Sequence, residues 1–360
     1  MPQYVRGKTT RQAHVGLPEG TVEEEHGREG FYGEVSHLYR LNPPTGWTDI
    51  DGPLRPRALD LSDVEAGDVR ALTMAVLVNE DVRLGIWRRA VAMPFFFRNA
   101  DGDDLLFVHR GEGRLETDYG PLDYRPGDYL VIPRGTTYRL DVAADTLLYT
   151  IETRGSIRPP DRGLLGPNAL WDESVIRVPD VDPHDERGDF EVVIKRAGEL
   201  TSVRYPFHPL DAVGWKGDLT PYALHVSDIR PVTSPRYHLP PSAHTTFQMD
   251  QAVVCTFLPR PLEQDPQALK VPFYHRNIDY DETIFYHDGE FFSRAGIGAG
   301  MLTWHPQGIH HGPQPQAVAS ASDKHETNEI AVMLDARRPL NLTDAAKAHE
   351  LAEYWRSWGA

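Results

Sequence analysis

An internal repeat restricts the fold of this 360-residue chain more than any other feature of its sequence. Residues 98–113 and 276–291 align without a gap, and eight of the 16 positions are identical. The identical pairs are Arg98/Arg276, Asn99/Asn277, Asp101/Asp279, Asp103/Asp281, Phe107/Phe285, His109/His287, Gly111/Gly289 and Glu112/Glu290. Such self-similarity is typical of one structural unit that occurs twice. We therefore expect a duplicated β barrel, with an N-terminal domain of residues 1–210 and a C-terminal domain of residues 211–360.

Short strands dominate the expected secondary structure. Runs of aromatic and β-branched residues, bounded by Gly, Pro, Asn or Asp, are typical of the strands of a barrel or sandwich. The 30 Gly and 30 Pro residues favour turns over long helices. The clearest runs lie at residues 91–97, 105–109, 129–132 and 137–142, and a second strand-dense region covers about 220–335. The sequence therefore predicts a mainly β fold, to which residues 1–70 contribute loops and edge strands.

The end of the chain differs from the rest. Residues 344–355 are strong helix formers, and Thr343 or Asn341 is suited to cap the start of a helix. Four large side chains in and just after this segment have the spacing of one helical face. They are Leu351, Tyr354, Trp355 and Trp358. We therefore expect a C-terminal helix that packs on the body of the protein.

Charge and cysteine content exclude several classes of protein. The chain carries 37 basic and 53 acidic side chains, a formal net charge of −16, without a concentrated basic patch. This balance argues against a nucleic-acid or membrane-surface binder. The single cysteine, Cys255, excludes an intrachain disulfide framework and a zinc site built from cysteines. Because no apolar run approaches the length of a membrane span, we expect a cytoplasmic protein.

The two copies of the repeat differ at positions that can bind a metal. The first copy lacks at least two of the metal-binding groups that the second copy has. The differing pairs, first copy before second, are Phe97 and His275, Asp104 and Glu282, and Pro133 or Arg134 and His311. We therefore expect a metal site in the second barrel and a metal-free first barrel.

His275, Glu282 and His311 form a set of two histidines and one carboxylate. Imidazole and carboxylate suit Fe(II), Mn(II) or Zn(II), and three ligands on one face leave positions where a substrate oxygen and O2 can bind. The wide gap between Glu282 and His311 is typical of ligands from separate strands of a barrel.

Two of these ligands have a neighbour that could replace them. Asp281 is the alternative carboxylate, but it has a counterpart in the metal-free copy, Asp103, so we prefer Glu282. His310 is the alternative to His311. Adjacent residues of a strand face opposite ways, so only one of the two histidines can face inward.

The second copy resembles the metal-binding cupin barrel of the homogentisate 1,2-dioxygenase family, whose members are bicupins. The family motif is Tyr-His-Arg-Asn, then Glu, then Gly seven residues later, and finally His-Gly-Pro. Here the motif is carried by residues 274–277, Glu282, Gly289 and residues 311–313. Residues 132–135, 165–170 and 215–222 also resemble family segments, so the likeness covers most of the chain. The His-Gly-Pro pattern favours His311 over His310.

The resemblance implies an Fe(II) enzyme that uses O2 to open the ring of homogentisate (2,5-dihydroxyphenylacetate), which gives maleylacetoacetate in the catabolism of tyrosine and phenylalanine. It implies that His275, Glu282 and His311 bind the iron. It further implies that His238 is the catalytic base or hydrogen-bond partner of a ring hydroxyl, and that His305 contacts the substrate. A homo-oligomer, either a trimer or a trimer-based hexamer, is also implied.

Two further residues bear on the substrate. Arg276 could bind a substrate carboxylate, although its counterpart Arg98 in the metal-free copy favours a structural role. Phe291 stands where the family tends to have a substrate-facing tyrosine. Since a site built around a hydroxyl group discriminates strongly, this difference leaves the identity of the aromatic acid open.

Three other functions stay open at this point. The protein could be a sister cupin dioxygenase that acts on another hydroquinone-type or gentisate-like acid. It could be a metal-dependent isomerase of a sugar or keto acid. It could also be a non-catalytic bicupin binding protein, but a purely structural duplication has no reason to keep His, Glu and His together in one copy.

Overall fold

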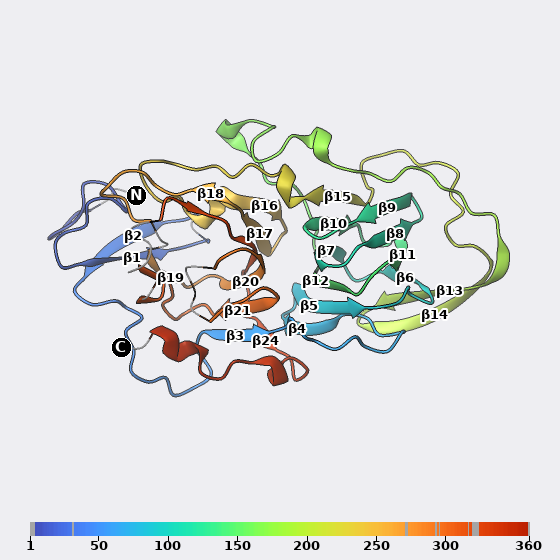
Figure 1. Cartoon of the computed structure of the whole chain (residues 1–360), viewed down its shortest axis with the longest axis horizontal. Coiled ribbons are helices and arrows are strands. Elements are labelled where there is room, and N and C mark those ends of the chain that lie inside the picture. Colours follow the sequence, from blue (N-terminus) through green and yellow to red (C-terminus); the bar gives the residue numbers. More distant parts are fainter. Residues whose placement is uncertain are drawn as a thin grey trace.

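The computed structural model describes residues 4–30, 32–270, 273–291, 294, 296–315, 317–318 and 324–358. Strands dominate these residues and form two lobes that lie side by side (Figure 1). Six short 3-10 helices are among the described elements: η1 (Gly163–Leu165), η2 (Glu173–Val175), η3 (Val226–Asp228), η4 (Pro241–His244), η5 (Lys347–His349) and η6 (Tyr354–Trp358). None of the helices in this part of the chain has the length and apolar character that a membrane span requires.

The first lobe is a barrel of two sheets that enclose an apolar core. Its strands are β4 (Met74–Val78), β5 (Val82–Arg89), β6 (Phe96–Asn99), β7 (Asp103–Arg110), β8 (Gly113–Thr117), β9 (Gly120–Tyr124), β10 (Asp128–Ile132), β11 (Thr137–Val142), β12 (Thr146–Thr153), β13 (Arg187–Arg196), β14 (Glu199–Phe207), β15 (Tyr222–His225) and β24 (Asn341–Leu342). One sheet has the order β15-β10-β7-β12-β5-β4-β24, and the other has the order β14-β13-β6-β11-β8-β9.

The second lobe has the same general construction. Its strands are β1 (Val22–Gly27), β2 (Val35–Arg40), β3 (Arg57–Asp60), β16 (Thr245–Gln248), β17 (Ala252–Phe257), β18 (Arg260–Pro261), β19 (Tyr274–Asn277), β20 (Asp281–Asp288), β21 (Met301–His305), β22 (Glu326–Thr327) and β23 (Ile330–Ala336). A six-stranded sheet has the order β16-β17-β23-β20-β21-β3, and a three-stranded sheet has the order β19-β1-β2. Strands β18 and β22 pair separately. The chain is therefore a mainly β protein with two barrels.

Strands from both ends of the chain cross between the lobes. Strands β1 and β3 come from the first 60 residues, yet they pair with β19 and β21 of the second lobe. Conversely, β15 and β24 lie beyond residue 210 and pair with β10 and β4 of the first lobe. These pairings connect the two lobes in both directions. The domain boundary near residue 210 stays a prediction.

The lobes share an apolar interface to which both copies of the repeat contribute. Tyr149 stacks on Phe285 with ring centroids 4.6 Å apart, and Phe107 approaches the same ring. His109 and His287, which are identical in the two copies, face each other with 3.0 Å between their Nδ1 atoms. Burial lowers the pKa of His109 to about 3 and that of His287 to about 4, so both imidazoles are neutral in the folded protein. The repeat therefore builds the lobe interface.

Strand register corrects one part of the alignment of the copies. In the second lobe, His275 bridges to His311, and Glu282 lies opposite His305. In the first lobe, the corresponding partner of Phe97 is Tyr138, and that of Asp104 is Ile132. The expectation that Pro133 or Arg134 occupies the place of His311 is therefore wrong. Tyr138 occupies that place, because it pairs with Phe97 as His311 pairs with His275. The sequence alignment was therefore out of register in the second half of the repeat.

The predicted C-terminal α-helix is also wrong. Residues 344–355 form turns, η5 and the start of η6 instead of one helix. Glu350 forms a β bridge with Leu59, and the N–H of Leu351 donates to the carbonyl of Ala58. This pairing with β3 takes the backbone out of a helical path. Tyr354, Trp355 and Trp358 are nevertheless buried against the second lobe, whereas Leu351 is exposed.

Candidate metal centre

Three side chains from separate segments converge in the second lobe. His275 lies on β19, Glu282 lies near the start of β20, and His311 follows β21 in the chain. The N–H of His275 donates to the carbonyl of His311 at 2.9 Å, and the reverse bond is 3.1 Å long. One ligand atom from each of the three residues lies within 4.8 Å of the others. The Oε2 atom of Glu282 is 3.7 Å from Nε2 of His275 and 3.6 Å from Nε2 of His311.

The donor set fits a divalent metal. His311 is buried, and neither of its ring nitrogens has a hydrogen-bond partner among the described residues. Burial lowers the pKa of His311 to about 3, so the ring is neutral and can donate a lone pair. The Nδ1 atom of His275 lies 3.0 Å from the carbonyl oxygen of Phe273, which can only accept, so the proton sits on Nδ1 and Nε2 faces the cluster.

The carboxylate of Glu282 stays ionised in spite of its burial. Burial alone would raise its pKa, but the neighbouring His311, His275 and His305 hold the pKa well below its usual range. The ionised carboxylate of Glu282 and the neutral imidazole of His311 are in the protonation states that a metal ion requires of its ligands.

Asp281 has a different role. Its carboxylate is buried and accepts hydrogen bonds from Trp304 Nε1 and from the backbone N–H groups of Gln307 and Leu340, each at 2.9 Å. Asp103 does the same in the first lobe, where it accepts from backbone N–H groups. Three donors occupy this carboxylate, so the geometry favours Glu282 as the ligand.

His310 lies on the opposite side of the chain from His311. Its Nε2 atom is 2.9 Å from Oε1 of Glu24, on strand β1. The two adjacent histidines therefore face different partners, as expected for neighbouring residues of extended chain. The geometry favours His311 as the ligand.

His305 lies behind Glu282. Since β20 and β21 pair with Glu282 opposite His305, the Nδ1 atom of His305 reaches Oε1 of Glu282 at 2.7 Å. The Nε2 atom lies 3.4 Å from the hydroxyl of Tyr354, and the residue is 0% exposed. His305 does not line the cavity next to the cluster. His305 thus contacts the carboxylate of Glu282, and the substrate contact that the resemblance implied stays a prediction.

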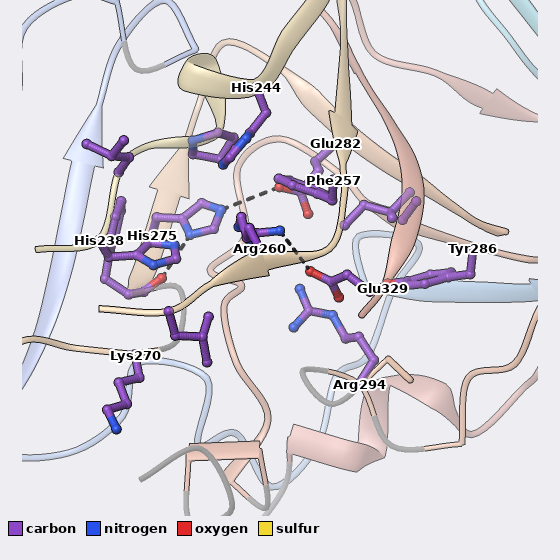
Figure 2. A pocket seen from close by; sticks show the side chains of 16 residues that line it. His238, His244, Phe257, Arg260, Lys270, His275, Glu282, Tyr286, Arg294 and Glu329 are labelled. Atoms are coloured by element: carbon purple, nitrogen blue, oxygen red, sulfur yellow. Dashed lines mark hydrogen bonds and ion pairs between the residues drawn. The ribbon is translucent and has the colours of Figure 1, made fainter. Parts of the chain in front are cut away.

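A cavity opens beside His275 and Glu282 (Figure 2). Its apolar wall includes Leu239, Phe257, Phe273, Ile284 and Ala331. The charged side chains that line it are Arg260, Lys270, Arg294 and Glu329, in addition to Glu282. Three cations against two carboxylates give the lining a positive balance, which differs from the chain as a whole and suits an organic acid.

His238 and His244 line the same cavity. The Nδ1 atom of His238 lies 2.9 Å from Oε1 of Glu263, so a proton on Nδ1 can be donated to this carboxylate. Burial lowers the pKa of His244 to about 3. Figure 2 shows His238 and His275 on one side of the cavity.

The sequence did not predict the charged group of Arg260, Glu329 and Arg294 that lines the same cavity. Arg260 Nη1 lies 3.6 Å from Oε1 of Glu329, and Arg294 donates to the carbonyl of Gly312 at 2.9 Å. Burial raises the pKa of Glu329. Only the position of Arg260 shortly after the apolar strand β17, which ends at Phe257, could have drawn attention to it, because folding brings these residues together from segments far apart in the chain.

The two residues considered for the substrate lie outside the cavity lining. Arg276 Nη2 is 3.1 Å from Nδ1 of His26, and its Nε atom is 3.6 Å from Glu24. Phe291 is buried in a cluster with Tyr286, whose ring centroid lies 4.8 Å away. Arg276 therefore connects β19 with β1, and Phe291 backs the wall of the cavity.

The first lobe keeps the same geometry without the imidazoles. Phe97 and Tyr138 stand in place of the two histidines and contact each other edge to face. Asp104, in place of Glu282, accepts from Asn99 Nδ2 at 2.9 Å. Burial, followed by the charge of Glu152, raises the pKa of Asp104 to about 7. These groups offer a metal one carboxylate and no nitrogen ligand.

The chain is similar to several known proteins. The family model of the homogentisate 1,2-dioxygenase N-terminal domain matches residues 71–226. A protein of Saccharolobus solfataricus named "Putative dioxygenase SSO1533" is 35% identical over 378 residues, which cover 98% of this chain and 98% of that protein. Among solved structures, a cupin 2 conserved barrel domain protein from Leptotrichia buccalis matches 78% of this chain and 96% of its own, at 10% identity and a TM-score of 0.38. A protein from Pseudomonas aeruginosa titled "Putative Glyoxylate Induced Protein" matches 84% of this chain and 98% of its own, at 13% identity and a TM-score of 0.38.

Proposed function

The chain belongs to the homogentisate 1,2-dioxygenase family, and on this premise we propose that it is an Fe(II)-dependent dioxygenase that opens the ring of homogentisate. The product is maleylacetoacetate, an intermediate of tyrosine and phenylalanine catabolism. Both oxygen atoms of O2 enter the product, so the reaction consumes no external reductant.

One observation carries the proposal. The second lobe brings His275, Glu282 and His311 together beside a cavity, whereas the equivalent positions of the first lobe hold Phe97, Asp104 and Tyr138. A purely structural duplication gives no reason for a buried His-Glu-His set at the wall of a cavity. Fe(II) at these ligands would supply a centre that lowers the pKa of a bound phenol and holds it close to O2.

The residues around this set have roles that follow from their positions. His238, whose Nδ1 faces Glu263, can accept the proton of a ring hydroxyl at Nε2. Arg260 is placed to pair with the carboxylate of the substrate, because it lines the cavity beside Glu329. His305 orients Glu282 from behind. The apolar wall formed by Phe257 and Ile284 excludes water from the ring.

A second candidate substrate is a gentisate-like acid. Phe291 replaces a tyrosine of the family motif and is packed against Tyr286, so it offers no hydroxyl to a substrate. Position 291 therefore adds no hydrogen bond to the selection between ring substituents, and a site without such a bond discriminates less strongly. This observation favours a broader range of hydroquinone-type acids.

Oxygen uptake tests the proposal. The protein is loaded with Fe(II) under anaerobic conditions and then exposed to O2 with homogentisate, gentisate, or hydroquinone without a carboxylate. We expect the highest kcat/KM with homogentisate and the lowest with hydroquinone, which cannot pair with Arg260. Faster uptake with gentisate would select the second candidate, and the absence of uptake with every substrate would refute the dioxygenase.

The proposal includes a cytoplasmic homo-oligomer, a trimer or a hexamer, as the resemblance implies. Light scattering coupled to gel filtration measures the mass of the assembly directly. A monomer would contradict this part of the proposal and would leave the chemistry of the metal centre untouched.

A further inference from the structure

A second cluster of histidines and carboxylates lies in the N-terminal segment, outside the site described above. His14, Glu25 and His37 each offer a ligand atom, and these atoms lie within 4.8 Å of one another. Glu25 lies on β1 opposite His37 on β2, and His14 is contributed by a turn that precedes β1. Figure 1 shows β1 and β2 beside β19 at the edge of the second lobe.

The spacing of the ligand atoms suits a metal ion. The Oε2 atom of Glu25 is 3.1 Å from Nε2 of His37 and 3.7 Å from Nε2 of His14. A tetrahedral zinc ion with bonds of about 2.0–2.2 Å holds neighbouring donor atoms roughly 3.3–3.6 Å apart. Two imidazoles and one carboxylate on a single face leave room for a further ligand, such as water.

Charge is the second argument. Glu23 and Glu25 are buried on the same face of β1, where their described ion-pair partners are His14 and His37 alone. Glu24, on the other face of β1, is balanced by arginines, namely Arg40 and Arg276. Carboxylates are rarely buried without a compensating charge. A divalent cation held between Glu25 and the two imidazoles would place compensating charge beside both carboxylates.

The backbone of His14 adopts an unfavourable conformation that its neighbours hold in place. Its φ angle of 65° lies in the left-handed region, which is unfavourable for a residue with a side chain. Its N–H donates to Oε2 of Glu23 at 3.0 Å, and its ring stacks on Phe273 at 4.2 Å. Glu23 and Phe273 thus hold the imidazole of His14 toward Glu25. Glu23 acts as a positioning residue, and the three remaining side chains are the ligands.

We propose that His14, Glu25 and His37 bind a structural Zn(II) ion that fastens the N-terminal segment to the strand carrying His275. Strand β1 runs parallel to β19, with Glu25 opposite His275 in the register. Phe273, which stacks on His14, also supplies the carbonyl that orients His275. The ion would therefore stabilise the backbone from which the catalytic ligand extends.

Zinc counting on the full chain tests this inference. The metal-free protein is incubated with Zn(II), passed through a desalting column, and analysed by mass spectrometry for bound zinc. We expect about two zinc ions per wild-type chain, one in His37→Gln, one in His311→Ala, and none in the double variant. Glu25→Gln should behave like His37→Gln, whereas His26→Gln, on the other face of β1, should keep both ions.

The outcomes separate this site from the proposed catalytic centre. If His37→Gln and Glu25→Gln bind as much zinc as the wild type, the second site is refuted, and the charge of the cluster is balanced by protons. If His311→Ala binds as much zinc as the wild type while His37→Gln loses an ion, the second site stands and the catalytic metal centre is refuted.

Limited proteolysis covers the case in which the His37→Gln variant fails to fold. In the His311→Ala background, Zn(II) should slow cleavage within residues 4–40 by at least tenfold, and a chelator should reverse this protection. Cleavage at the same rate with and without Zn(II) would overturn the inference.

Discussion

At the scale of single residues, Asp281 and Glu282 show how adjacent carboxylates acquire different roles. The repeat predicted this difference from the sequence alone. Asp281 is identical to its counterpart Asp103, whereas Glu282 differs from its counterpart Asp104. The structure gives the physical reason. Three hydrogen-bond donors surround Asp281, and three imidazoles surround Glu282.

We predict opposite effects for the two amide variants. Glu282→Gln should lower the bound iron to less than a tenth of the wild-type amount, because an amide cannot replace the charge of the carboxylate ligand. Asp281→Asn should retain iron and lose about 1–3 kcal/mol of folding stability, since one of its donors is left unpaired. Iron analysis and urea unfolding measure the two effects. Loss of iron in Asp281→Asn with retention in Glu282→Gln would reverse the assignment.

We propose that His305 is a positioning residue, because it contacts Glu282 and lies outside the cavity lining. We expect His305→Phe to weaken iron binding by about 10–100-fold, as is usual when the partner that orients a ligand is removed. His305→Gln should restore part of the affinity, since its amide can still donate to Glu282. Competition with a chelator gives both affinities, and equal affinities in the two variants would contradict the positioning role.

At the scale of elements, strands were easier to predict than the C-terminal segment. The periodic pattern of residues 344–355 obeys helical propensity, but pairing with β3 at Glu350 and Leu351 overrides that propensity. The hydroxyl of Thr343 accepts a hydrogen bond from the N–H of Ala346, but it caps no helix, because the short η5 begins after Ala346 without a side-chain cap. Local pattern cannot reveal a partner strand that lies almost 300 residues away.

Turn η6 should support the metal centre. The Nε1 atom of Trp358 donates to the carbonyl of Gly312 at 3.1 Å, and its ring packs edge to face on His305. We predict that Trp358→Ala lowers stability by about 3–5 kcal/mol and also weakens iron retention. Leu351→Ala is the matched control and should change stability by less than about 0.5 kcal/mol, because Leu351 is exposed. Undiminished stability of Trp358→Ala would show that η6 is not needed by the lobe.

Strand β7 of the first lobe carries a titratable carboxylate, Asp104, at the position equivalent to Glu282. The pKa of Asp104 is raised from 3.8 to about 7, so between these values the folded protein holds a proton that the unfolded chain releases. Stability should therefore fall as the pH rises through this window. Asp104→Asn should reduce the loss of stability between pH 5 and pH 8 by about 2 kcal/mol. Denaturant unfolding at both pH values measures this difference, and equal losses in both proteins would refute it.

At the scale of the whole molecule, the repeat predicted two barrels and their unequal metal chemistry. It could not predict that β1 and β3 join the second lobe, because a strand-forming segment carries little information about which strand it pairs with. Nor could it predict the group of Arg260, Glu329 and Arg294, because only the fold brings these residues together around the cavity. Motif residues were predictable because their chemistry is local, and the cavity was not because it depends on the packing of distant segments.

We propose that the His-Glu-His set of the second lobe performs ring cleavage with Fe(II). The most direct measurement is the amount of O2 consumed per homogentisate in the iron-loaded protein, in the Glu282→Gln variant, and in the first-lobe control Asp104→Asn. We predict one O2 per ring in the wild type and in Asp104→Asn, and no iron-dependent consumption in Glu282→Gln. Undiminished consumption in Glu282→Gln, or its loss in Asp104→Asn alone, would contradict the claim.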